Sequence, residues 1–340
     1  MAGSVQALDS YYLSITLLVT IAYQLFFFAI AYSLKFDKLT DFAGGTNFVV
    51  LAVLTLALSR SPDVRQIVAS VFVMAWGLRL SLFLLYRAIR TGKDDRFDGT
   101  RDKFFPFLGF WVFQMLWVWA VSLPVTMLNS PAVRMYQPQV PFGTGRDIAA
   151  VVLFGIGFIM ESVSDVQKFM FRSRNDRSGG ICDSGFFYWS RHPNYFGEII
   201  TQFAIYMICV SPAADGPVTG QTFNALYATI IGPLFLTILL LFVSGLPLSE
   251  RPGAKKRYKK GLNWNGYHRY LNRTSILIPF PPQVYERLPI FIKRTVFLEF
   301  PMYVFDPAKH SDTAQNRHLA EGDDGNSTSN RQPTTTGTWI

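Results

Sequence analysis

The chain has 340 residues, of which 50% are hydrophobic and 16% aromatic, whereas only 16% are charged. An average soluble protein carries about 25% charged residues, and the apolar residues here gather in long blocks, so the composition excludes an ordinary soluble domain. The formal net charge is +9, but the basic residues flank the apolar blocks, where attraction to anionic lipid headgroups explains them. We therefore expect an integral membrane protein of the all-α class that contacts membrane lipids and binds no nucleic acid.

Seven apolar stretches approach the roughly 17 to 25 residues that a helix needs to cross the hydrocarbon. They lie at about residues 11–34, 42–59, 64–86, 104–128, 146–164, 194–212 and 224–246. The second opens with Gly44-Gly45 and the sixth begins inside a polar motif, so either could be a partly buried or tilted segment. We expect a polytopic membrane helix bundle of about seven transmembrane helices, with six or eight as alternatives.

The pattern of polarity divides the chain into four parts. These are an N-terminal transmembrane helix (1–40), a membrane domain (41–285), a short amphipathic or apolar segment (286–305) and a polar tail (306–340). The tail consists mostly of Asp, Asn, Ser, Thr, Gln and Gly and has almost nothing to bury. We expect it to be disordered.

Loop charge predicts the orientation in the membrane, because short cytoplasmic loops carry the excess of Lys and Arg. The loops on one side of the membrane, counted together with the segment from the last span to Arg273, contain 21 Lys and Arg residues. The loops on the opposite side contain 4. This places the N-terminus outside or in a lumen and the C-terminus in the cytoplasm. We expect a multi-pass protein of the endoplasmic reticulum or another endomembrane.

The fifth span carries an ionisable stripe. Glu161, Asp165, Lys168 and Arg172 are spaced by 4, 3 and 4 residues, which places them on one face of a helix. Charges at membrane depth normally face a bundle interior or a watery cavity, although local ion pairing and snorkelling of the two cations to the headgroups is the alternative. Arg79 in the third span needs an acidic partner, and Glu161 or Asp165 is the candidate.

The start of the sixth span combines side chains of very different chemistry. They are Arg191, His192, Asn194, Tyr195 and Glu198. Pro193 suits the first turn of a helix, where its missing N–H costs nothing, and from there Tyr195, Glu198 and Gln202 recur at helical spacing. We expect a polar stripe that descends into the span; an interfacial anchor is the alternative, since Tyr, Arg and His favour the headgroup region.

After the last span, Tyr267, Tyr270 and Arg273 are spaced by three and could share one face of a short helix that acts as a lid. We expect the basic clusters and this aromatic segment to converge on one cytoplasmic vestibule that suits a large anionic cofactor. Lys168, Arg172 and Arg191 would hold phosphates through charge-assisted hydrogen bonds. The sequence contains no Gly-x-Gly-x-x-Gly fingerprint, and no spacing typical of metal ligands.

These motifs resemble the steroid 5-alpha-reductase-like superfamily, and its branch of uncharacterised multi-span membrane proteins in particular. The resemblance covers roughly residues 45 to 285 and rests on four segments: Asp165–Arg172, Gly185–Glu198, Tyr267–Ser275 and Ile278-Pro279. It implies a cofactor site at the cytoplasmic end of the C-terminal helices. In the reductases the cofactor is NADPH, and the positions similar to theirs are Lys168, Arg172, Trp189, Arg191, Asn194, Tyr195, Glu198, Tyr267 and Tyr270.

The resemblance further implies an NADPH-dependent reductase of a carbon–carbon double bond in a steroid-like, sterol-like or other lipophilic substrate taken from the bilayer. Tyr195 is the first candidate for the proton donor, with Glu198 orienting it from one helical turn away. His192 is the second candidate, and hydroxyl groups deeper in other spans, on Tyr86 or Tyr206, are further alternatives.

Two other functions remain open. The superfamily includes isoprenylcysteine carboxyl methyltransferases, so an S-adenosylmethionine-dependent methyltransferase acting on a lipophilic acceptor is an alternative. Those relatives carry a paired Glu-Glu before their last aromatic segment, where this chain has Glu250 followed by Arg251. A non-catalytic lipid-binding or scaffold protein that keeps the fold is the third possibility, because a shared fold does not guarantee shared chemistry.

Overall fold

The computed structural model describes residues 5–36, 38–91, 99, 102–175 and 179–310. Within these residues the chain folds into helices and forms no strand, which confirms the predicted all-α class. Of the predicted polar tail, residues 311–340 lie outside the described residues, and Pro307–His310 form the short helix α15.

Seven helical segments of the described ranges are long and apolar enough to cross a membrane, which confirms the predicted number of spans. The first six are α1 (Leu13–Ser33), α2 (Leu39–Leu58), α3 (Val64–Thr91), α4 (Phe104–Leu128), α6 (Gly145–Asn175) and α8 (Pro193–Ala214). The seventh is a run of α9 (Gly220–Ala228), α10 (Ile231–Ile238), the π-helix η2 (Leu239–Val243) and α11 (Leu246–Lys259). The second and sixth stretches, for which a partly buried or tilted segment was the alternative, form α2 and α8, and both are long and apolar enough to span.

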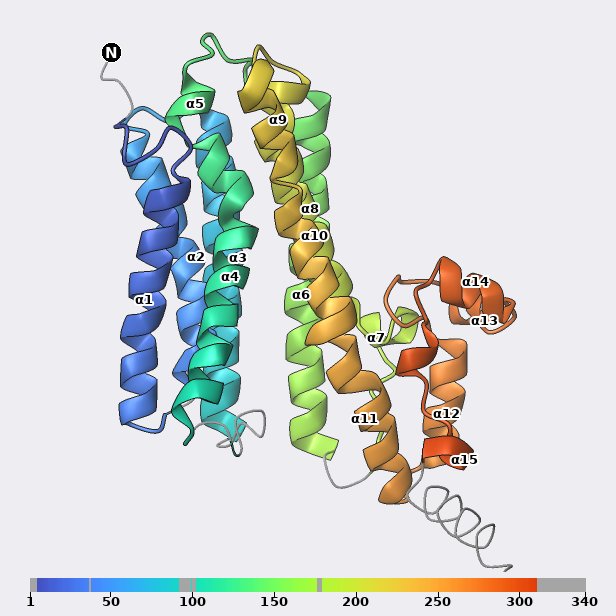
Figure 1. The fold of residues 1–340 in the computed structure, drawn as a ribbon. Coiled ribbons are helices and arrows are strands. Elements are labelled where there is room, and N and C mark those ends of the chain that lie inside the picture. Colours follow the sequence, from blue (N-terminus) through green and yellow to red (C-terminus); the bar gives the residue numbers. More distant parts are fainter. Residues whose placement is uncertain (1–4, 37, 92–98, 100–101, 176–178, 311–340) are drawn as a thin grey trace, which may run out of the picture.

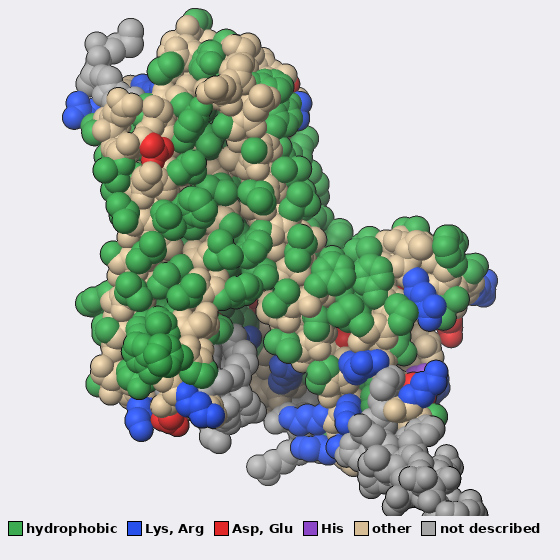
Figure 2. Space-filling view, in the orientation of Figure 1, with side chains coloured by type: hydrophobic (Ala, Val, Ile, Leu, Met, Phe, Trp, Pro, Cys, Tyr) green, Lys and Arg blue, Asp and Glu red, His purple; other side chains and the backbone are tan. Residues whose placement is uncertain are grey.

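The remaining elements are short. They are α5 (Pro131–Arg134), α7 (Phe186–Trp189), α12 (Trp264–Arg273), α13 (Pro282–Tyr285), α14 (Ile290–Thr295) and the 3-10 helix η3 (Pro301–Tyr303). Figure 1 shows α1 to α4 as one group, α6, α8 and the α9–α11 run as a second, and α12 to α15 beside the lower end of the second group. We call the end of the bundle where α6 and α11 terminate the basic end. Lys and Arg side chains gather there, and the face in Figure 2 is hollowed between α1–α4 and α11.

Small residues let α6 and α8 pack with their backbones close together. A Cβ on Gly197 would lie 2.6 Å from the carbonyl oxygen of Gly157 and 2.7 Å from the backbone nitrogen of Glu161. Such a distance is too short for any side chain, so glycine is required here. Close packing at small residues is typical of membrane helix pairs, and it holds the polar stripe of α6 directly against the polar stripe of α8.

The last span changes helix type before it reaches the basic end. The π-helix η2 is followed by a break at Ser244 and Gly245 and by a restart at Leu246. A Cβ on Gly245 would lie 2.3 Å from the carbonyl oxygen of Leu240, so the break depends on this glycine. Single π-helical turns occur frequently at functional sites, and this one brings Glu250 of α11 towards the start of α8.

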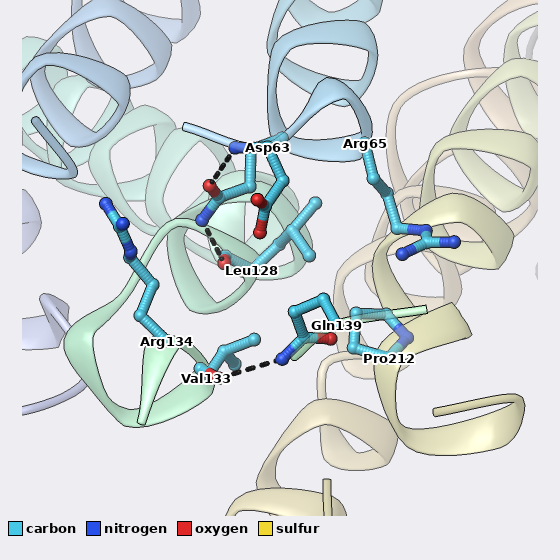
Figure 3. A pocket seen from close by; sticks show the side chains of 8 residues that line it. Asp63, Arg65, Leu128, Val133, Arg134, Gln139 and Pro212 are labelled. Carbon is cyan, nitrogen blue, oxygen red and sulfur yellow. Dashed lines mark hydrogen bonds between the residues drawn. The ribbon is translucent and has the colours of Figure 1, made fainter. Parts of the chain in front are cut away.

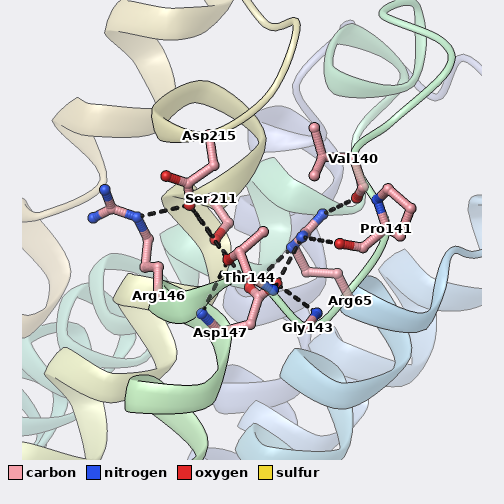
Figure 4. A network of polar contacts seen from close by, with 9 residues as sticks. All are labelled: Arg65, Val140, Pro141, Gly143, Thr144, Arg146, Asp147, Ser211 and Asp215. Atoms are coloured by element: carbon pink, nitrogen blue, oxygen red, sulfur yellow. Dashed lines mark hydrogen bonds and ion pairs between the residues drawn. The ribbon is translucent and has the colours of Figure 1, made fainter.

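The opposite end of the bundle holds a small pocket and an ion-pair network. The pocket has a volume of about 10 Å³ (Figure 3), which is close to the space of one water molecule, so it is no candidate ligand site. In the network, the Arg65 Nη2 lies 2.7 Å from the Asp147 Oδ2, and Ser211 donates to the same carboxylate at 2.9 Å (Figure 4). This network joins α3, α6 and α8 where they are farthest from the basic end.

Candidate active site

The predicted stripe of α6 faces inward and is paired with Arg79 of α3. The Arg79 Nη1 lies 2.5 Å from the Glu161 Oε1, and the Arg79 Nη2 lies 2.7 Å from the Asp165 Oδ2. The prediction that Arg79 needs an acidic partner in α6 is therefore confirmed, and the guanidinium uses both candidates. The Nδ2 of Asn194 donates to the other oxygen of Asp165 at 3.0 Å, which connects the start of α8 to the same cluster.

Carboxylates outnumber cations in this part of the site. Glu161 is buried, and Glu198 interacts electrostatically with Asp165 and Arg79. The Glu198 side chain is half-buried and makes no hydrogen bond or ion pair within the described part of the chain. The buried Glu161 Oε2 and Asn194 Oδ1 also have no hydrogen-bond partner there. Buried polar atoms are almost always satisfied, so this cluster has free polar groups for a polar ligand or for water.

A second buried cluster surrounds Arg191. Its Nη1 lies 3.0 Å from the Glu250 Oε2, and its Nη2 pairs with Glu299. The Tyr285 hydroxyl donates to the second oxygen of Glu299 at 2.6 Å. Two carboxylates thus already occupy the guanidinium of Arg191, which was predicted to hold phosphate, and the exposed fraction of the residue is only 6%. Here its contacts are those of a structural residue.

His192 belongs to the same cluster. Its Nε2 lies 2.7 Å from the Glu250 Oε1, and because a carboxylate only accepts, the proton is on Nε2 and Nδ1 is left as an acceptor. Burial lowers the pKa of His192 to about 4, although the hydrogen bond to Glu250 acts in the opposite direction. The imidazole is therefore neutral at pH 7. The Tyr195 ring stacks on it with centroids 4.9 Å apart and an angle of 12°, which fixes the direction of the phenol.

The segment around α12 covers this cluster, and its predicted helix is present. The Tyr270 hydroxyl donates to the carbonyl oxygen of Phe187 at 2.9 Å, and the backbone N–H of Arg191 donates to the carbonyl oxygen of Ser275 at 2.8 Å. Tyr267 lies under the Arg257 guanidinium, 4.7 Å from its ring centroid. Burial and the nearby Glu250 carboxylate raise the pKa of Tyr267 to about 12, so its phenol stays protonated at pH 7.

Two predicted cations are not paired. Lys168 is half-buried, and its Nζ lies 5.8 Å from the centroid of the Phe187 ring. Arg172, one turn further along α6, is exposed. Neither makes a hydrogen bond or an ion pair with any residue that the structure describes, although Lys168 lies within electrostatic reach of Asp165 and Glu250. Figure 2 shows Lys and Arg side chains in the hollow at this end of the molecule.

The predicted residues therefore separate into three groups. The first group consists of half-buried residues on the facing sides of α6 and α8, with the exposed Arg172 one turn beyond them: Lys168, Asn194, Tyr195 and Glu198. Polar atoms without a partner among the described residues occur there. Arg191, His192 and Tyr270 are held in internal hydrogen bonds and ion pairs, with Tyr267 packed under Arg257. Trp189 is 44% exposed and lines a groove on the outer face of α6 instead.

The sequence did not reveal Glu250 and Glu299 as partners of Arg191, or Tyr285 as the donor to Glu299. Glu250 was examined only as a lone acidic residue, although a buried Arg-His pair at the start of α8 does require one. Glu299 lies 108 residues from Arg191, in the segment predicted to be amphipathic or apolar, and no spacing in the sequence connects the two.

Together, the fold and these clusters define a seven-span helical membrane protein with a polar site at its basic end. The chain belongs to the DUF1295 family, described as a protein of unknown function, whose match covers residues 27–274. No curated protein and no solved structure matches the chain. The polar stripes of α6 and α8, Glu250 and α12 lie inside the matched range, whereas Glu299 and Tyr285 lie beyond it.

Proposed function

We propose that this protein is a membrane-embedded reductase that uses NADPH to reduce a carbon–carbon double bond in a lipophilic, steroid-like or sterol-like substrate. The observation that carries the proposal is that Lys168 and Arg172, on the face of α6 that also carries Glu161 and Asp165, have no polar partner among the described residues. The resemblance of the α6, α8 and α12 motifs to the steroid 5-alpha-reductase-like superfamily supports the same reading.

The free groups fit a dinucleotide phosphate. An ammonium and a guanidinium one helical turn apart can bind phosphate oxygens through charge-assisted hydrogen bonds. The unpaired Glu161 Oε2 and Asn194 Oδ1 and the half-buried Glu198 are acceptors for amide or hydroxyl donors. Arg191 has a positioning role in this proposal, because it holds Glu250, which in turn holds His192.

Reduction of the double bond adds one hydride and one proton. NADPH supplies the hydride when it is bound. We assign the proton to the Tyr195 hydroxyl, whose ring is held parallel to the neutral His192. Glu198 lies one turn along the same face of α8 and orients the phenol. Preorganised donors of this kind stabilise charge that develops in a site shielded from water.

Thermal unfolding of the detergent-solubilised protein with NADPH, NADH or S-adenosylmethionine tests the choice of cofactor. A ligand at a hundred times its dissociation constant stabilises the folded protein by about 2.7 kcal/mol. We expect stabilisation by NADPH that is lost in Lys168→Ala and Arg172→Ala. Arg174→Ala is the matched control, because it removes an exposed cation from the other face of α6 and should keep the effect.

The other functions give different results in the same experiment. Stabilisation by S-adenosylmethionine alone would contradict the proposed reductase and indicate a methyltransferase that acts on a lipophilic acceptor. No stabilisation by any of the three ligands would indicate a non-catalytic lipid-binding or scaffold protein.

A further inference from the structure

The face of α6 opposite to Asp165 and Lys168 is apolar and exposed along the length of the helix. Large side chains recur there at helical spacing: Val152, Ile156, Ile159, Val163, Val166 and Met170. Each of them is at least 42% exposed. A spanning helix turns its charged face to the bundle interior, so this stripe faces lipid.

At the basic end the stripe runs into a groove between α6 and the segment Gly185–Trp189. The groove has a volume of about 920 Å³, which lies within the roughly 300 to 1,000 Å³ of typical ligand pockets. Val166 and Met170 form one wall, Phe186 and Trp189 form the other, and Arg174 lies at the end. Among the described residues that line it, the groove is mostly apolar, and its one cation, Arg174, lies at one end.

The outer wall of the groove is fixed by hydrogen bonds. The Nε2 of Gln167 donates to the carbonyl oxygen of Ser184 at 2.6 Å. Gly185 follows with a φ of 58°, and a Cβ there would lie 2.6 Å from the Gln167 Nε2. At the other end of the wall, the carbonyl oxygen of Trp189 accepts from the Phe280 N–H at 3.0 Å. The groove is thus pre-formed and needs no partner to shape it.

We propose that this groove is a binding site for a membrane phospholipid with an anionic headgroup. Its acyl chain lies against Val166 and Met170, and its phosphate pairs with Arg174. The lining runs from Ser162 to Arg174, which is about 18 Å of helix at a rise of 1.5 Å per residue. One leaflet contributes about 15 Å, half of the hydrocarbon thickness of about 30 Å, so the groove is one leaflet deep.

The polar end of the groove suits the headgroup region. Arg174 is exposed and makes no hydrogen bond or ion pair with any residue in the described ranges. Trp189, which lines the same groove, is 44% exposed, and tryptophan is enriched at the membrane–water interface. The site is separate from the inward face of α6 and depends on neither NADPH nor the proposed reaction.

Native mass spectrometry of the full chain, delipidated in detergent, tests the site with phosphatidylglycerol and phosphatidylcholine of identical acyl chains. We expect the wild-type protein to retain more phosphatidylglycerol than phosphatidylcholine. Arg174→Gln should lose this preference. Arg172→Gln, which removes an exposed cation from the opposite face of α6, should keep it. Equal retention of both lipids by the wild type, or equal effects of the two substitutions, would overturn the proposal.

A second measurement does not depend on any variant. Phosphatidylglycerol with a diazirine on its acyl chain is photolysed with the wild-type protein in nanodiscs, and the labelled peptides are identified. We expect the label to concentrate on residues 162–174 and 185–189. A label spread evenly over the exposed apolar faces of α1, α3 and α4 would indicate ordinary surrounding lipid and would reject the site.

Discussion

Arg79 and Arg191 show how single residues organise this site. Each guanidinium binds two carboxylates: Arg79 binds two of α6, and Arg191 binds Glu250 of α11 and Glu299 of the segment after α14. Replacing one partner of such a buried pair typically costs 3 to 5 kcal/mol, roughly, because the other charge stays buried. The two arginines therefore hold the site together, and on the same face of α6 Lys168 and Arg172 are left without a polar partner among the described residues.

The neutral His192 predicts a pH dependence of stability. Its folded-state pKa of about 4 is below the value of about 6.5 for an unfolded chain, so between these values the unfolded chain binds the extra proton. Stability should therefore fall as the pH falls from about 6.5 towards 4, by up to about 3 kcal/mol, and should be independent of this group above pH 7. Thermal unfolding of the wild type and of His192→Gln at pH 7 and pH 4.5 measures the effect. An equal loss in both proteins would show that His192 is not the group responsible.

How far the sequence predicts the site also depends on single residues. The need of Arg79 for a partner was predictable, because an isolated charge in a span is costly and its candidates lay at helical spacing in one neighbouring span. The partners of Arg191 were not predictable, because Glu299 comes from an irregular segment with no periodicity. The position of Trp189 was not predictable for a similar reason. Trp189 is close to Arg191 in the sequence, but this does not determine that its indole lies in the groove on the outer face of α6.

At the scale of elements, the close contact between α6 and α8 sets the geometry of the site. The helices were predictable from long apolar stretches, but α6 continues to Asn175, beyond the apolar stretch that ends near residue 164. Of the charged residues in this extension, only Asp165 is tied to neighbouring helices in the described part of the chain, by its ion pair with Arg79 of α3 and its hydrogen bond from Asn194 of α8. The π-helical turn in the seventh span has no sequence signal apart from Gly245.

The α6–α8 contact predicts a large difference between two glycine substitutions. Gly197→Ala would place a Cβ 2.6 Å from the carbonyl oxygen of Gly157 and force the helices apart. Overpacking of this kind typically costs about 1 to 3 kcal/mol, and it should also weaken NADPH binding. Gly155→Ala is the matched control, because nothing lies within 4 Å of its Cβ position, and alanine favours a helix by up to about 1 kcal/mol. Thermal unfolding of both variants compares them, and a similar midpoint would contradict the packing account.

At the scale of the whole molecule, the two ends of the bundle have different roles. The end with Arg65 and Asp147 holds a saturated ion-pair network and a pocket with space for about one water, whereas the basic end holds the free cations and the hollow. The two helix groups in Figure 1 are joined by ion pairs at the Arg65 end and near the middle of α3 and α6. Among the described residues, the polar groups without a partner that we assign to a ligand lie towards the basic end.

This division predicts that stability and ligand binding can be separated. Asp147→Asn leaves the buried Arg65 without its charge partner, so we expect a loss of roughly 3 to 5 kcal/mol in stability. The dissociation constant for NADPH should change little, because the substitution is at the opposite end of the bundle. Thermal unfolding and a binding titration on the same preparation test both parts. Weakened NADPH binding with unchanged stability would reverse the assignment of the two ends.

The most direct test of the account is a titration of NADPH with the purified protein in nanodiscs, followed by the fluorescence of the nicotinamide. We predict saturable binding to the wild type and to Arg174→Ala. For the double variant Lys168→Ala/Arg172→Ala we predict a dissociation constant at least about tenfold higher, which corresponds to about 1.4 kcal/mol. Absence of saturable binding to the wild type, or equal affinity in the double variant, would contradict the claim that these two cations form a cofactor site.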